Sequence, residues 1–158
     1  MIVKIKEFIE KYAKGGAIPR DLQIKLLNAT LEGKTRYDIS DADYRITLAN
    51  YEKFVTEEQA LFKCAELNNK GMAQEKSGNI DLAIETYEEN IKGGYPALHS
   101  YERLMILYRK RKDYLNELRI IDIALDVFNK DGIPFDTNQI REKYKQRKEK
   151  ALTLLNKL

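Results

Sequence analysis

The sequence predicts an all-α protein in which antiparallel helix hairpins stack into a short solenoid. Apolar residues recur at helical spacing through most of the 158 residues. Two stretches, Ser77–Glu85 and Arg111–Arg119, match each other 34 residues apart, and a repeat of this length in a helical context indicates stacked helix pairs. Hydrophobic residues at 43%, charged residues at 34% and only three prolines are typical of a folded helical protein. We therefore expect one helical domain over residues 1–158.

The first part of the chain, residues 1–55, is expected to hold three N-terminal helices. Residues 2–14 space their apolar side chains as an amphipathic helix, and Gly15 with Gly16 supplies a left-handed stop. Pro19 suits the first turn of a second helix, which is expected to end at Gly33. The apolar face expected for this second helix consists of Leu22, Leu26, Leu27 and Ala29.

A polar connection is expected around Tyr37 and Asp38, before the third helix. Ser40 or Asp41 is expected to start that helix, because an oxygen-bearing side chain can accept a hydrogen bond from a free first-turn amide. Its expected face consists of Tyr44, Leu48, Tyr51 and Val55.

Residues 56–131 are expected to form two helix pairs. Thr56 followed by Gln59 has the spacing of a capping box, so a new helix is expected to begin there and to run to about Ser77. Gly78 and Asn79 make the turn into the next helix. The expected bounds of the remaining helices are from that turn to Gly93–Gly94, from Pro96 to Arg111, and from Tyr114 to Asn129.

Residues 136–158 are expected to form a C-terminal capping helix. Asp131, Gly132 and Pro134 break the chain before it, and Asp136 or Thr137 is expected to start it. One face of the helix is narrow and apolar, and the opposite face is strongly charged, so one face should pack and the other stay wet. The apolar stripe consists of Ile140, Tyr144, Ala151, Leu155 and Leu158.

The 34-residue register resembles the tetratricopeptide repeat (TPR) family, whose units are antiparallel helix pairs. In the first unit, from Cys64 to Ala97, Gly71 matches the small residue where the two helices approach closely, and Gly78 matches the turn. The second unit runs from Leu98 to Asp131. The packing positions that match are Ile80, Ala83 and Tyr87 in the first unit and Tyr101, Leu104, Tyr108, Tyr114, Leu118, Ile121 and Ala124 in the second. The resemblance implies a right-handed superhelix whose core is completed by the flanking helices.

Four positions depart from the TPR pattern. Met105 stands at the close-approach position, Asn90 and Glu117 stand where alanine is usual, and Gln74 stands where an aromatic residue is common. TPR modules that hold the C-terminal carboxylate of heat-shock chaperones use a clamp spread over three units. Here Met72 replaces a clamp asparagine and a third unit is missing, so chaperone-tail binding is not expected.

The resemblance implies a concave groove lined by the first helix of each unit, which takes a peptide or a partner's helix. Asn68 could hydrogen-bond an extended backbone, Met72 and Ile106 could offer apolar contact, and Arg103 or Arg109 could meet a carboxylate. The alternative is that these are ordinary solvent-facing residues. The candidate groove positions are Asn68, Met72, Glu75, His99, Glu102, Arg103, Ile106 and Arg109.

No catalytic or cofactor site is expected. Gly33-Lys34-Thr35 ends like a phosphate-binding loop, but Asn28 stands where the motif needs glycine and the preceding residues look helical. His99 is the only histidine, which excludes a histidine-based metal cluster, and Cys64 is expected to be a small buried hydrophobe. Glu88 and Glu89 look like part of a solvated face. We therefore expect neither enzyme activity nor a metal or other cofactor.

The last helix supports an alternative function. Residues 137–158 carry seven Lys or Arg and two Glu, a side-chain balance of +5 against +3 for the whole chain. Such a helix could neutralise the phosphates of a nucleic acid or bind an acidic partner, although most basic runs are simply the wet side of a terminal helix. The basic positions are Arg141, Lys143, Lys145, Arg147, Lys148 and Lys150.

The first hypothesis is a non-enzymatic adaptor that binds an as yet unidentified protein or peptide, with homo-association as a possible form. The N-terminal residues interrupt their apolar side chains with charges, so no signal peptide is expected. No stretch approaches the length of a transmembrane helix, and no membrane role is expected. A single cysteine favours a reducing, cytoplasmic location.

Overall fold

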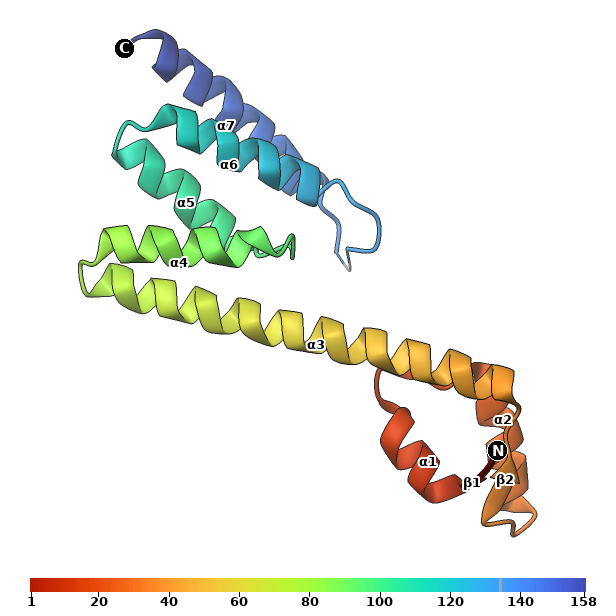
Figure 1. The fold of residues 1–158 in the computed structure, drawn as a ribbon. Coiled ribbons are helices and arrows are strands. Elements are labelled where there is room, and N and C mark those ends of the chain that lie inside the picture. Colours follow the sequence, from red (N-terminus) through yellow and green to blue (C-terminus); the bar gives the residue numbers. More distant parts are fainter. Residues whose placement is uncertain (134) are drawn as a thin grey trace. The chain divides into compact units, whose positions relative to one another are not determined.

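The computed structural model describes residues 1–133 and 135–158, and Pro134, expected to break the chain, lies outside them. The described chain is predominantly helical, which confirms the all-α class, and it adds one small sheet (Figure 1). In chain order the elements are β1 Ile2–Lys4, α1 Ile5–Tyr12, the short helix η1 Lys14–Gly16, α2 Arg20–Leu31, β2 Arg36–Asp38, α3 Asp41–Lys76, α4 Ile80–Lys92, α5 Leu98–Lys110, α6 Tyr114–Val127 and α7 Asn138–Asn156.

The chain divides into two compact units, residues 1–60 (unit 1) and residues 61–158 (unit 2). Each unit has its own cluster of buried hydrophobic side chains. The division falls inside α3, so this helix contributes to both cores. That the two units form the single domain expected over residues 1–158 stays a prediction.

Unit 1 begins with a strand where a helix was expected. β1 pairs antiparallel with β2, with Val3 opposite Tyr37, so the expected polar connection is also a strand. The N-terminal ammonium group extends the pairing, because it donates to Asp38 Oδ1 and to Ile39 O, both at 2.8 Å. The β-branched residues of β1 favour this extended backbone, but their partner strand lies more than 30 residues away, beyond the reach of a local helical pattern.

The core of unit 1 lies between α1, α2 and the first part of α3. Tyr12 packs edge-on against Tyr51 with ring centroids 5.2 Å apart. Leu22, Leu26 and Ala29 of α2 are buried as expected, but Leu27 is 58% exposed. Leu27 follows Leu22 by five residues and therefore points roughly 140° away from it on the helix. The prediction that Leu27 belongs to the apolar face of this helix is therefore wrong.

The expected helix boundary at Thr56 is absent, because α3 continues unbroken from Asp41 to Lys76. The Thr56 hydroxyl donates to the carbonyl oxygen of Glu52 at 2.9 Å, one turn back in the same helix. A threonine can satisfy its hydroxyl either at a cap or by bonding the preceding turn, and the local sequence does not distinguish the two. The predicted limit between residues 1–55 and residues 56–131 therefore falls inside a helix.

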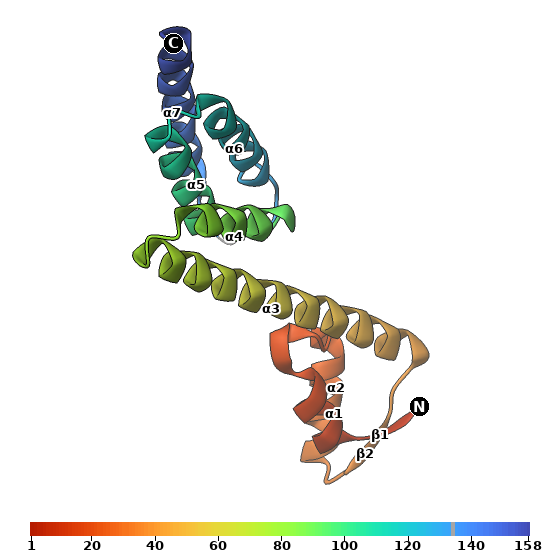
Figure 2. The ribbon, with the colours of Figure 1, turned by 60° about the vertical axis from the view of Figure 1, so that its left-hand side comes forward.

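Unit 2 consists of the end of α3 followed by α4, α5, α6 and α7. Both ribbon views show α4 alongside the end of α3, and α7 alongside α6 (Figure 2). The buried aromatic side chains Tyr87, Tyr101, Phe128 and Tyr144 are at most 1% exposed. Cys64 is buried and free, as expected. The expected bounds of α4 to α7 agree with the structure to within about two residues, the usual uncertainty of helix ends.

Gly71 allows α3 and α4 to approach closely. A Cβ atom added at Gly71 would lie 2.3 Å from Tyr87 Cε1 and 2.6 Å from Tyr87 Cζ, closer than real Cβ contacts. Because Tyr87 is fully buried, its ring has little room to move aside. The role predicted for Gly71 is confirmed.

The turn between α5 and α6 repeats the turn between α3 and α4, with a less suitable residue. Gly78 has φ +79°, and Lys112, 34 residues later, has φ +58°.

Because a Cβ disfavours left-handed backbone, Lys112→Gly is expected to raise the free energy of unfolding by about 0.5–1 kcal/mol. Chemical denaturation measures this. The control Lys110→Gly, at the end of α5, should instead lower stability by about 1 kcal/mol. A less stable Lys112→Gly variant would contradict the expectation.

Candidate partner-binding face

The structure brings the expected groove residues of α3 and α5 together through an ion pair. Arg103 Nη2 lies 2.5 Å from Glu75 Oε1, and Arg103 Nε donates to Glu75 Oε2 at 2.9 Å. The Tyr87 hydroxyl donates to the same Oε2 at 2.7 Å. Arg103 is thus already paired within the protein, so a ligand carboxylate would have to compete with Glu75 for it.

The hydrogen bond from Arg103 is the main reason that the pKa of Glu75 lies below its ordinary value of 4.5. A lowered native pKa means that the unfolded chain takes up the proton first. The contribution of Glu75 to stability is therefore complete above about pH 4.5 and is lost as the pH falls through the native pKa.

The free energy of unfolding of the wild type should consequently fall more steeply below about pH 4.5 than that of Glu75→Gln. Urea denaturation at a series of acidic pH values measures both slopes. Arg103→Met should flatten the same limb, because it removes the principal cause of the shift. Equal slopes for wild type and Glu75→Gln would contradict this assignment.

Asn68 takes part in a buried polar cluster instead of standing free. Its Oδ1 accepts from Asn90 Nδ2 at 2.9 Å and from Ser100 Oγ at 2.5 Å. Asn90 also donates to the carbonyl oxygen of Cys64 at 3.1 Å. Asn90 therefore replaces the usual small residue with hydrogen bonds that join α3, α4 and α5. Asn68 Oδ1 is thus already used within the chain, and a role of Asn68 in binding a peptide backbone stays a prediction.

Two further groove candidates contact α7. Glu102 accepts from Lys143 Nζ at 3.0 Å and from the Tyr144 hydroxyl at 3.3 Å. Arg109 pairs with Glu117 and donates to the carbonyl oxygen of Arg147 at 3.2 Å. These two side chains contact the C-terminal helix within the chain, and their role in binding a partner stays a prediction.

Glu117 is a buried charged residue whose ion pairs the sequence does not predict. It stands at a usual alanine position, yet it is fully buried and faces two arginines. Its Oε1 lies 2.8 Å from Arg109 Nη2 and 2.8 Å from Arg147 Nε, both as ion pairs without hydrogen-bond alignment. Arg109 Nε donates to Glu117 Oε2 at 3.1 Å. Burial, followed by the charge of Arg109, lowers the pKa of Arg147. The only signal in the sequence is that Glu117 stands where alanine is usual in the TPR pattern. This departure does not identify the partners of Glu117.

Two of the remaining candidates, Met72 and Ile106, place apolar side chains beside the Glu75–Arg103 pair. Met72 is 49% exposed and lies one turn before Glu75, and Ile106 is half-buried and lies one turn after Arg103. The His99 ring packs edge-on against Tyr87 with centroids 5.7 Å apart, and its Nε2 has no hydrogen-bond partner among the described residues. We call the surface formed by Met72, Glu75, His99, Arg103 and Ile106 the α3–α5 face.

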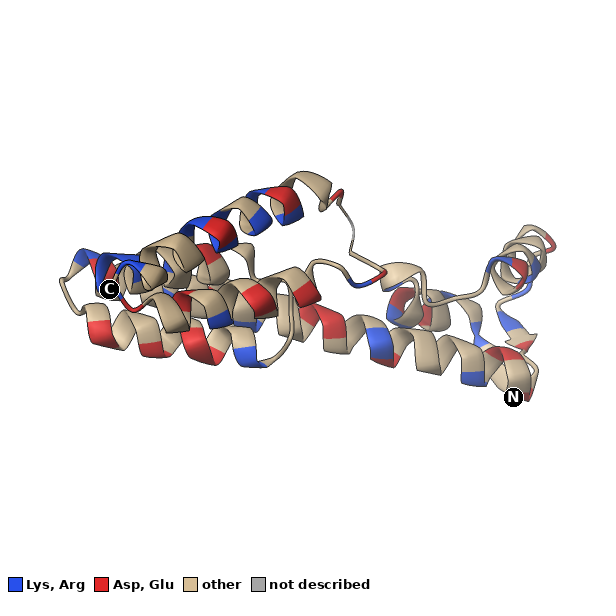
Figure 3. Cartoon of the chain, turned by 90° about the horizontal axis from the view of Figure 1, so that it is seen from above, with Lys and Arg blue, Asp and Glu red and all other residues tan. Residues whose placement is uncertain are grey.

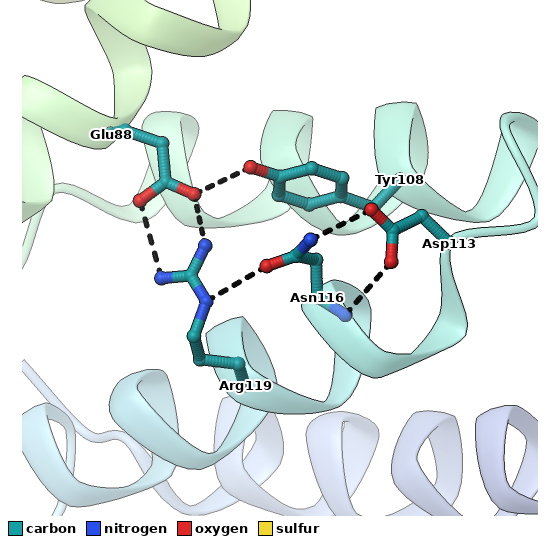
Figure 4. A network of polar contacts seen from close by, with 5 residues as sticks. All are labelled: Glu88, Tyr108, Asp113, Asn116 and Arg119. Carbon is teal, nitrogen blue, oxygen red and sulfur yellow. Dashed lines mark hydrogen bonds and ion pairs between the residues drawn. The ribbon is translucent and has the colours of Figure 1, made fainter.

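A second polar network joins α4, α5 and α6. Glu88 of α4 accepts from the Tyr108 hydroxyl of α5 at 2.6 Å and pairs with Arg119 of α6 (Figure 4). Burial and Glu88 raise the pKa of Tyr108 to about 12. Asp113 caps α6 by accepting from the backbone N–H of Asn116 at 3.2 Å. Glu88 is therefore a cross-link between three helices, and its expected assignment to a solvated face is wrong.

The basic residues of α7 are largely used within the chain. Figure 3 shows Lys and Arg recurring along the helix that ends at the C-terminus. Lys143 pairs with Glu102, Arg147 with Glu117 and Lys148 with Asp122, and Arg141 donates to Asn129 at 3.0 Å. Lys145 and Lys150 are exposed. Pairing reduces the positive charge available to phosphates, and binding of nucleic acid or an acidic partner through this helix stays a prediction.

Within the described residues, no helix has the length and apolar character needed to cross a membrane. The same residues contain no group of three or more His, Cys, Asp or Glu side chains placed to hold a metal ion. Neither observation identifies a function.

Comparison with known proteins adds no name to this geometry. The sequence matches no protein-family model and no curated protein, and the structure matches no solved structure. TPR membership consequently stays a prediction that depends on the 34-residue register and the residues quoted for it.

Proposed function

We propose that unit 2 is a TPR-like, non-catalytic module that binds an apolar segment of a protein partner on its α3–α5 face. The observation that carries this proposal is the 49% exposure of Met72 on a face whose charged side chains already pair with each other. A partner that covers Met72 and Ile106 gains apolar burial without having to separate a free charge from water. A right-handed superhelical arrangement and a cytoplasmic location belong to the same proposal.

Rigidity supports this mode of binding. The polar clusters around Asn90, Glu88 and Glu117 join successive helices of unit 2. Because these contacts order the helices before a partner arrives, binding loses little conformational entropy. The flexible side chain of Met72 on this face adapts to side chains of different shape. The expected partner is therefore a short apolar helix or an extended apolar segment.

The double variant Met72→Ala/Ile106→Ala should weaken partner binding at least roughly tenfold, since it truncates the two apolar contacts. A photoreactive amino acid at position 72 first captures the partner in cells of the native host. Titration calorimetry with the purified partner then measures the change in affinity.

The matched control is Leu115→Ala, which truncates a 67% exposed leucine of α6 outside the α3–α5 face. It should leave the affinity unchanged. Equal affinities of the wild type and the double variant would overturn the proposal.

A further inference from the structure

Helix α2 has apolar side chains on two opposite faces. Leu22, Leu26 and Ala29 are buried in the core of unit 1. Ile24, Leu27 and Leu31 are 48%, 58% and 77% exposed, and their spacing of three and four residues places them in one stripe on the other side of the helix. A helix that is apolar on both sides is normally packed on both sides. We call Ile24, Leu27 and Leu31 the outer stripe.

The outer stripe adjoins an apolar hollow between α1 and α2. The hollow has a volume of about 420 Å³, and its lining includes Ile9, Leu26, Leu27 and Thr30. A second hollow of about 400 Å³ shares Ile9 and Thr30 with it and continues toward Ile5. Ile9 itself is 38% exposed. Unit 1 therefore presents a ridge of apolar side chains next to an apolar depression.

We propose that α2 packs antiparallel against α2 of a second copy of this chain, forming a two-fold symmetric dimer. In this arrangement the outer stripe of each copy covers the stripe of the other, and the leucine side chains enter the neighbouring hollow. A two-fold interface requires one surface that complements itself. Each copy carries both a ridge, the outer stripe, and a depression, the hollow between α1 and α2. The ridge of one copy can therefore fit the depression of the other. The proposal is independent of the function proposed for unit 2.

The charges at the ends of α2 favour the antiparallel direction. Arg20 is the first residue of α2, on the same side as the outer stripe. Glu32 directly follows the last residue and forms an exposed ion pair with Lys34 at 2.6 Å. Because an exposed ion pair contributes little, Glu32 can exchange Lys34 for an arginine of a second copy. Antiparallel pairing brings each Arg20 near the partner's Glu32, twice by symmetry. A parallel pair would place like charges together at both ends. Antiparallel helices also bring opposite ends of the helix dipoles together.

The interface is short. The 12 residues of α2 span about 18 Å, so the area buried is smaller than the roughly 800 Å² per partner of a standard stable complex. We therefore expect a reversible dimer whose population depends on protein concentration. Sedimentation equilibrium of the full chain over a wide concentration range should show a transition between the masses of one and two copies.

Leu27→Lys tests the centre of the interface and should raise the dimer dissociation constant at least roughly 30-fold. Because Leu27 is exposed in the single chain, circular dichroism and thermal unfolding measured at low concentration should stay unchanged. The matched control is Leu115→Lys on the exposed surface of α6, which should dimerise like the wild type.

Charge reversal tests the direction of pairing. Arg20→Glu and Glu32→Arg should each weaken the dimer, and the double variant should recover it, because the pair is restored in the opposite sense. A chain that stays monomeric at its highest soluble concentration would overturn the proposal. A dimer that is indifferent to Leu27→Lys would also overturn it, since another surface would then be responsible.

Discussion

Glu117→Ala is expected to lower the free energy of unfolding of unit 2 by about 3–5 kcal/mol. Glu117 is fully buried, and its carboxylate lies against Arg109 and Arg147, whose side chains are 28% and 20% exposed. Removing the carboxylate leaves two partly buried positive charges without a counter-charge, and their desolvation is then uncompensated. Urea denaturation followed by circular dichroism measures the loss.

Two variants separate the charge effect from a loss of packing. Glu85→Ala removes an exposed carboxylate from α4 and should change stability by less than about 0.5 kcal/mol. Adding Arg109→Met and Arg147→Met to Glu117→Ala removes the orphaned charges and should recover a part of the loss. If the triple variant is less stable than Glu117→Ala, the two arginines stabilise the fold by another route and the charge argument is wrong.

Gly71→Val is expected to destabilise the same unit by about 3 kcal/mol, because the new side chain must displace a buried ring. The added Cβ alone would lie 2.3 Å from Tyr87 Cε1, and the Tyr87 hydroxyl is held by Glu75 at 2.7 Å. The ring can move only by giving up this hydrogen bond or by pushing α3 and α4 apart. Thermal and urea unfolding measure the effect.

Gly93→Val is the matched control for the change of residue type. Gly93 follows α4 with φ −72°, and no atom beyond its chain neighbours lies within 4 Å of an added Cβ. Stability should change little there. In a Tyr87→Leu background the ring is gone, so Gly71→Val should cost clearly less than in the wild type. An equal cost in both backgrounds would show that the ring is not the obstacle.

The helices of unit 2 could be predicted because their signals are local. Gly71 and Gly78 lie seven residues apart in one helix-turn segment, and their spacing indicates both the close approach and the turn. The packing residues of α4 to α6 recur at helical spacing within single helices. Such patterns need no information about distant parts of the chain.

Three predictions about the fold were wrong, at β1, at Thr56 and at Leu27. β1 depends on pairing with β2, and the course of α3 through Thr56 depends on which acceptor the hydroxyl takes. Leu27 was assigned to the core from its neighbours in sequence, although it points to the other side of α2. For β1 a distant contact decides, for Thr56 the hydroxyl has two local partners to choose from, and for Leu27 the angular position on the helix decides.

The helices that carry the groove candidates could be predicted, but the contacts of these side chains could not. The sequence by itself determined that the eight groove candidates lie on two helices, α3 and α5. Only the tertiary structure decided that Glu75 and Arg103 pair with each other, that Glu102 and Arg109 hold α7, and that Met72 stays exposed. Helical periodicity depends on neighbours in the chain. A charged side chain, in contrast, is stabilised by whichever opposite charge the folded chain brings within a few ångströms, and that choice exists only once the helices are packed.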